Sequence, residues 1–166
     1  MGLCPITEGS LGDGVFGART FLGQSGAIAI GTDSNVLIDA AQEMRTIEYV
    51  QRLTHRERNV LTEIPGASSG RTLFDAVLAG GSRALGVPAF GITEGAPADL
   101  IALRADHPAL TARTGDALLD GWIFSARNNP IERVWRAGRL VVVNGWHVNR
   151  AAIETRFRHT LSRLLA

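Results

Sequence analysis

Apolar residues change their spacing several times along the first half of the chain. Residues 26–31 form a short apolar run bounded by glycines, which is typical of a buried parallel strand, and residues 2–5 predict the end of another strand. Residues 40–53 predict a helix whose apolar stripe consists of Met44, Ile47, Tyr49, Val50 and Leu53. Between them, we expect a turn at residues 11–14 and a short helix over residues 15–22.

A further helix is expected over residues 72–85, capped by Ser68 or Ser69. The pair Gly80-Gly81 inside it lowers helix propensity and therefore indicates close packing against a neighbouring element. The remaining pattern predicts a strand over residues 98–104 and a helix over residues 116–126. A hairpin is expected from residues 131–136 and 139–144, turning at Ala137-Gly138. Residues 151–165 predict a closing amphipathic helix.

These patterns divide the chain into two parts of an α/β protein. Residues 1–86 predict parallel strands with helices, and residues 87–166 predict a small β-rich domain with a C-terminal helix. One or two parallel strands do not make a sheet, because parallel strands need neighbours and cover on both faces. A complete (β/α)8 barrel takes about 250 residues. We therefore expect the first part to be the end of a barrel whose earlier strands are absent from this chain.

Composition excludes several classes of function. The formal net charge of +1 creates no field that would attract nucleic acid or an acidic membrane. No apolar run is long enough to span a membrane. The single cysteine, Cys4, permits no intrachain disulfide, which fits a reducing compartment such as the cytoplasm.

The most specific motif runs from residue 31 to residue 61. It contains Gly31-Thr32-Asp33-Ser34 at the end of the expected strand, Glu43-Met44-Arg45 and Glu48-Tyr49 on the next helix, and an arginine-rich turn before Asn59-Val60-Leu61. The first 14 residues contain further motif residues, Cys4-Pro5, Thr7-Glu8 and Leu11-Gly12-Asp13-Gly14. A third segment, ERVWRAGRLVVVNG, covers residues 132–145. Over nearly the whole chain, these residues resemble formimidoylglutamate deiminases of the amidohydrolase superfamily.

The resemblance implies a fold and a reaction. The fold is the C-terminal fragment of a (β/α)8 metal-dependent hydrolase barrel, about strands 7–8 with their helices, followed by part of a small β-rich composite domain. The reaction is the hydrolysis of N-formimino-L-glutamate to N-formyl-L-glutamate and ammonia at a zinc ion. Of the zinc ligands that the family uses, only the aspartate that ends the last strand has a counterpart here, Asp33, and the chain contains no His-x-His.

Asp33 is accordingly the candidate for both catalysis and metal binding. A carboxylate beside a metal-bound water can take its proton and pass it to the leaving ammonia. A polar turn that merely ends the strand is the alternative interpretation. Ser34 and Asn35 could orient Asp33 or cap the following helix.

Other polar residues are candidates for contacts with the substrate. Glu8, Ser10 and Asp13 lie on the expected loop after the seventh barrel strand, where they could line the substrate pocket, although a solvated turn is the alternative for Asp13. Arg52 could contact an acidic substrate, or it could belong to a solvated charged face with Glu57.

Catalytic zinc sites use several protein ligands, so we expect this chain alone to bind no zinc tightly and to be inactive. The alternatives are a fragment of another amidohydrolase deaminase, similar to guanine deaminase or a chlorohydrolase, and a non-catalytic interaction or structural module. The expected partners are a small-molecule substrate in the complete enzyme and either a second copy of the chain or the missing N-terminal barrel segment.

Overall fold

The computed structural model describes residues 1–34, 37–62, 64–87 and 90–166, which form two compact units. The first unit comprises Met1–Ala96 and Ala105–Asn129, and the second comprises Pro97–Arg104 and Pro130–Ala166. These units differ from the division expected at residues 86 and 87, because residues 90–96 and Ala105–Asn129 group with the first unit. Long-range contacts explain the difference. Arg45 donates hydrogen bonds to the carbonyls of Ile123 and Ala126.

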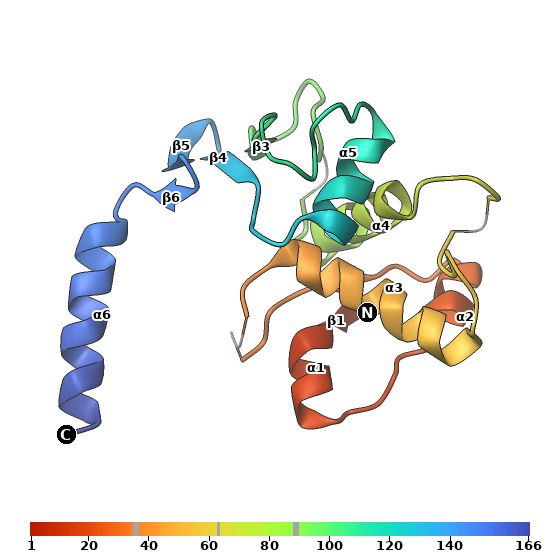
Figure 1. Cartoon of the computed structure of the whole chain (residues 1–166), viewed down its shortest axis with the longest axis horizontal. Coiled ribbons are helices and arrows are strands. Elements are labelled where there is room, and N and C mark those ends of the chain that lie inside the picture. The colour runs from red at the N-terminus through yellow and green to blue at the C-terminus, as the bar shows by residue number, and fades with distance from the viewer. Residues whose placement is uncertain (35–36, 63, 88–89) are drawn as a thin grey trace. The chain divides into compact units, whose positions relative to one another are not determined.

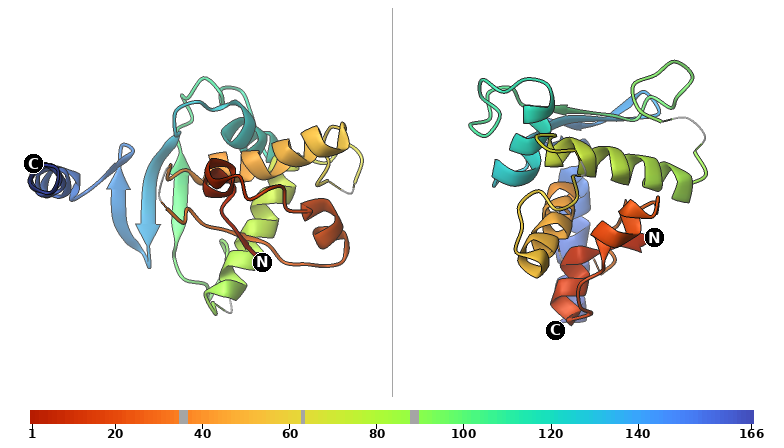
Figure 2. Two further views of the ribbon diagram at one scale, coloured as in Figure 1. Left: turned by 90° about the horizontal axis from the view of Figure 1, so that it is seen from below. Right: turned by 90° about the vertical axis from the view of Figure 1, so that its right-hand side faces the viewer.

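The first unit pairs two short parallel strands and surrounds them with helices. β1 (Gly2–Leu3) is followed by α1 (Pro5–Leu11), α2 (Ala18–Gly23), β2 (Ala29–Ile30), α3 (Ala40–His55), α4 (Ser69–Ala84), α5 (Asp116–Asp120) and the π-helix η1 (Gly121–Ser125). In Figures 1 and 2, α3 and α4 are the two long helices of this unit. The predicted strand over residues 26–31 is confirmed but short, because β1 pairs with only Ala29 and Ile30.

Local signals account for the two long helices. Asp39 caps α3 by accepting hydrogen bonds from the amides of Ala41 and Gln42. Ser68 caps α4 by accepting from the amide of Arg71, as one of the two expected caps. The predicted close packing at Gly80 is also confirmed, since a Cβ atom there would lie 1.8 Å from the carbonyl oxygen of Ile28 on the segment that leads into β2.

The core of the first unit is apolar with a few buried polar side chains. Its largest fully buried apolar members are Ile28, Met44, Leu73 and Ile123. Trp122 is also buried and belongs to this core. The apolar stripe of α3 is only partly correct, because Leu53 is 79% exposed and Tyr49, 41% exposed, stacks on Phe124 at the unit's surface.

The second unit is a four-stranded antiparallel sheet followed by a helix. The strands β3 (Leu100–Leu103), β4 (Ile131–Arg136), β5 (Arg139–Val143) and β6 (Trp146–His147) lie in the order β3-β4-β5-β6, and α6 (Arg150–Leu164) follows. The hairpin between β4 and β5 turns at the predicted Ala137-Gly138, where both residues have positive φ, the geometry of a tight hairpin turn. Within this unit, which the structure describes throughout, only Pro130 is buried.

α6 forms where the closing helix was expected, but its apolar side is exposed to solvent in this chain. The side chains concerned are Ile153, Phe157, Leu161 and Leu164. Among the described helices, none is long and apolar enough to cross a membrane.

Candidate active site

Asp33 lies in the turn that follows β2, at the C-terminal end of the strand. In barrel enzymes this end of the strands carries the catalytic side chains. Asp33 is exposed, and its φ of 44° lies in the left-handed region that residues other than glycine seldom adopt. Aspartate adopts this region more readily than most residues other than glycine, so its short polar side chain suits this place in the turn.

The turn is held from α1 by Thr7, a motif residue to which the sequence alone assigned no role. Thr7 is 2% exposed, and its Oγ1 donates a hydrogen bond of 3.1 Å to the carbonyl oxygen of Thr32. The hydroxyl of Ser34 in turn donates to Thr7 Oγ1 at 3.4 Å. Ser34 therefore does not cap α3, a role that Asp39 takes, and Asn35 lies outside the described residues.

The two expected substrate-contacting residues, Glu8 and Ser10, both lie on α1 and make hydrogen bonds to nearby backbone. Glu8 Oε1 accepts a hydrogen bond of 2.7 Å from the amide of Cys4, just before the helix. The Ser10 hydroxyl donates to the carbonyl oxygen of Ile6 at 2.9 Å. The half-buried Glu8 side chain therefore stabilises the start of the helix through its bond to Cys4. Ser10 is exposed and faces solvent. A contact of either residue with substrate stays a prediction.

A second carboxylate, that of Glu43 on α3, holds the start of α1. Glu43 is 1% exposed, and its Oε2 accepts a hydrogen bond of 3.0 Å from the amide of Ile6. The other oxygen, Oε1, is buried without a partner among the described residues. Burial raises the pKa of Glu43, the Ile6 amide opposes this effect, and the charges of Glu8 and Asp39 reinforce it.

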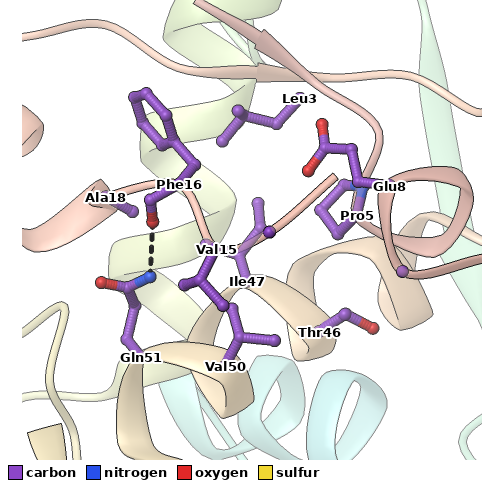
Figure 3. Close-up of a pocket in the computed structure, with 12 residues that line it drawn as sticks. Leu3, Pro5, Glu8, Val15, Phe16, Ala18, Thr46, Ile47, Val50 and Gln51 are labelled. Atoms are coloured by element: carbon purple, nitrogen blue, oxygen red, sulfur yellow. Dashed lines mark hydrogen bonds between the residues drawn. The ribbon is translucent and has the colours of Figure 1, made fainter. Parts of the chain in front are cut away.

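A small cavity lies between α1, the loop that follows it, and α3 (Figure 3). Its volume is about 70 Å³, and its lining is mostly apolar, including Leu3, Val15 and Ile47. Gln51 closes one side by donating a hydrogen bond of 2.7 Å to the carbonyl oxygen of Phe16 (Figure 3). Small-molecule sites typically enclose about 300–1,000 Å³, so this cavity is too small for a substrate.

The motif residues from Glu48 to Leu61 form a structural network instead of a substrate site. Glu48 is 0% exposed, and its carboxylate accepts from the amides of Val60 at 2.9 Å and Leu61 at 3.2 Å. Arg52 donates to the same carboxylate at 2.7 Å and to the side chain of Asn59 at 3.0 Å. The alternative partner for Arg52, Glu57, instead pairs with Arg19. Arg52 therefore fastens the end of α3 to the loop that follows it.

The described residues do not bring together a zinc site. No group of three or more histidine, cysteine, aspartate or glutamate side chains with suitable placement occurs in the part of the chain that the structure covers. Of the expected ligand set, these residues supply Asp33 alone. Because catalytic zinc requires several protein ligands, the donor set present here does not fit the ion by itself.

Comparison with known proteins gives relatives that are much longer than this chain. Formimidoylglutamate deiminase from Pseudomonas aeruginosa is 43% identical over 164 residues, which cover 99% of this chain and 36% of the relative. The crystal structure of an amidohydrolase from Brucella melitensis superposes with a TM-score of 0.92 at 45% identity, covering 99% of this chain and 36% of that one. A zinc-bound adenosine deaminase from Xanthomonas campestris gives a TM-score of 0.81 at 25% identity, covering 98% of this chain and 36% of that one.

The agreement in fold identifies the two short strands and their helices as a fragment of a (β/α)8 barrel enzyme. The chain spans about a third of the length of these relatives. The model of the amidohydrolase family matches residues 2–141, which include both strand ends and the Asp33 turn. This chain belongs to the amidohydrolase family.

Proposed function

We propose that this chain is the part of a formimidoylglutamate deiminase that carries Asp33, and that the complete enzyme hydrolyses N-formimino-L-glutamate to N-formyl-L-glutamate and ammonia. The observation that carries the proposal is the 43% identity to the Pseudomonas aeruginosa deiminase across 99% of this chain. The name of that relative supplies the substrate, because the small cavity beside α1 and α3 is not lined by Asp33 and does not identify one.

Asp33 is the side chain that we propose this chain contributes to the reaction. Its position supports the role, since it follows β2 at the end of the strand where barrel enzymes carry out their chemistry, and its exposed carboxylate is free to meet other groups. A carboxylate there can accept a proton from the attacking water and donate it to the departing ammonia. Zinc, the metal of the family, would require further ligands from outside this chain.

A chimera tests the proposal. This chain replaces the matching part of the Pseudomonas aeruginosa deiminase, so that the remaining barrel strands come from the relative. We expect the zinc-loaded chimera to release ammonia from N-formimino-L-glutamate, and D33N to abolish the release, a loss on the order of a hundredfold or more. The control D75N changes an exposed aspartate on α4 that pairs with Arg71, and it should retain activity.

Two outcomes of the same experiment would contradict the proposal. Full activity of D33N would remove Asp33 from the reaction. A folded chimera that deaminates a purine such as adenosine or guanine, and not N-formimino-L-glutamate, would establish the alternative of another amidohydrolase deaminase. The likeness to the zinc-bound adenosine deaminase is the observation that favours this alternative.

The 166-residue chain alone should release no ammonia and retain no zinc after dialysis, because its described residues provide only Asp33 as a ligand from the family's set. We propose the cytoplasm as its compartment on the basis of its single cysteine. The partner that completes the sheet is either the rest of the barrel or a second copy of the chain. Light scattering that shows a stable monomer would exclude the second copy.

A further inference from the structure

Three segments that are distant in sequence meet at the Asp33 turn. The first is the turn itself, the second is α1, and the third is the start of α3, where Glu43 lies. Thr7 links the first two through its hydroxyl, and Glu43 links the last two through the amide of Ile6. The proposed function assigns a role to Asp33 but none to the residues that hold it.

We propose that Thr7 is a positioning residue that fixes the backbone of Asp33, and that Glu43 sets the place of Thr7. This inference rests on the proposed function for the role of Asp33, but its geometry does not depend on the identity of the substrate.

The hydroxyl of Thr7 acts on both sides of Asp33. It donates to the carbonyl of Thr32, the residue before Asp33, and it accepts from the hydroxyl of Ser34, the residue after it. A turn that is held at both neighbours of its central residue has little freedom to leave the left-handed region, where Asp33 has a φ of 44°. The buried position of Thr7 keeps water from competing for these hydrogen bonds.

Glu43 fixes the helix that carries Thr7. Its Oε2 binds the amide of Ile6, the residue next to Thr7, and this hydrogen bond spans 37 positions of sequence. α1 is short and contains a glycine, Gly9, so it has little stability of its own and depends on such contacts. A shift of α1 would move the Thr7 hydroxyl away from the Thr32 carbonyl.

The test follows the backbone of Asp33 in the full 166-residue chain by NMR. The reporter is the nuclear Overhauser effect between the amide proton and Hα of Asp33, which is strong when φ is positive and weak when φ is negative. We expect T7V, which replaces the hydroxyl by a methyl group, to lose the strong effect, and T7S, which retains the hydroxyl, to keep it. S34A removes one of the two hydrogen bonds at an exposed residue and should weaken the effect.

The matched control is T72V. The hydroxyl of Thr72 donates to the carbonyl of Ser68 within α4, so this variant removes a threonine hydroxyl that does not touch the turn. A general loss of stability would affect T7V and T72V alike, whereas a positioning role affects the Asp33 signal in T7V alone. If T7V does not fold, S34A decides the question.

An unchanged Asp33 signal in S34A and in any folded T7V would overturn the inference. That result would leave the deaminase proposal intact, because the chimera measures ammonia release separately. Conversely, a chimera without activity would not alter the NMR result. In an active chimera, T7V should lower turnover and T7S should restore it.

Discussion

Gly80 and Gly81 are neighbours on α4, yet an alanine should have opposite effects at the two positions. A Cβ atom at Gly80 would lie 1.8 Å from the carbonyl oxygen of Ile28 and 2.5 Å from its carbonyl carbon. Both are backbone atoms of a residue that is 0% exposed, so neither can rotate away. At Gly81 a Cβ atom would meet nothing within 4 Å.

The expected magnitudes follow from these distances. Overpacking typically costs about 1–3 kcal/mol, and a contact this short with backbone belongs at the upper end. Replacing glycine by alanine inside a helix returns about 0.8–1 kcal/mol. We therefore expect G80A to lower the free energy of unfolding by about 1–2 kcal/mol, and G81A to raise it by up to about 1 kcal/mol.

Thermal unfolding followed by circular dichroism measures both variants. For a chain of this size, 1 kcal/mol corresponds to roughly 2–4 °C in Tm. G80A should therefore unfold roughly 2–8 °C below the wild-type chain, and G81A up to roughly 4 °C above it. A G80A chain as stable as the wild type would refute the close approach of α4 to Ile28. A G81A chain that is destabilised would refute the open surroundings of Gly81.

Three further changes test the packing of the first unit. E48A leaves the buried amides of Val60 and Leu61 unpaired, at about 1–3 kcal/mol each, and should lower the urea midpoint; an unchanged midpoint would contradict the network. S68A removes the cap of α4 and should cost about 1 kcal/mol in the same assay. Because the folded pKa of Glu43 is raised above its usual 4.5, the wild type binds more protons when folded and loses stability as pH rises through that pKa. E43Q cannot ionise, so its Tm should rise relative to the Tm of the wild type as the pH increases above 4.5. A difference in Tm between the two proteins that stays the same at every pH would contradict the raised pKa of Glu43.

Local patterns were sufficient to predict the elements that local interactions stabilise. α3 and α4 have periodic apolar residues and side-chain caps, and the β4–β5 hairpin has turn residues suited to positive φ. These features act over a few positions, so they can be read from sequence. The location of Asp33 at a strand end followed from the same reasoning, aided by the family resemblance.

The elements that were missed depend on distant contacts. α1 is only 7 residues long, and side chains from other parts of the unit hold it in place. Thr7 belongs to the motif, but its role at the Asp33 turn was not predicted because its partner Thr32 lies 25 positions away. The grouping of Ala105–Asn129 with the first unit was not predicted, because its attachment to α3 depends on Arg45, which lies about half the chain away.

The Glu48 network changes what a match to the family signature means. Glu48 and Asn59 belong to the sequence motif by which the chain resembles its family, and Arg52 lies between them. The polar groups of these three residues form hydrogen bonds with one another and with the amides of Val60 and Leu61. They are scaffolding for the bend after α3. A related chain can keep these residues while its substrate changes, because they do not contact the substrate. The motif therefore indicates family and fold. The residues that surround Asp33 in the complete barrel determine which substrate is selected.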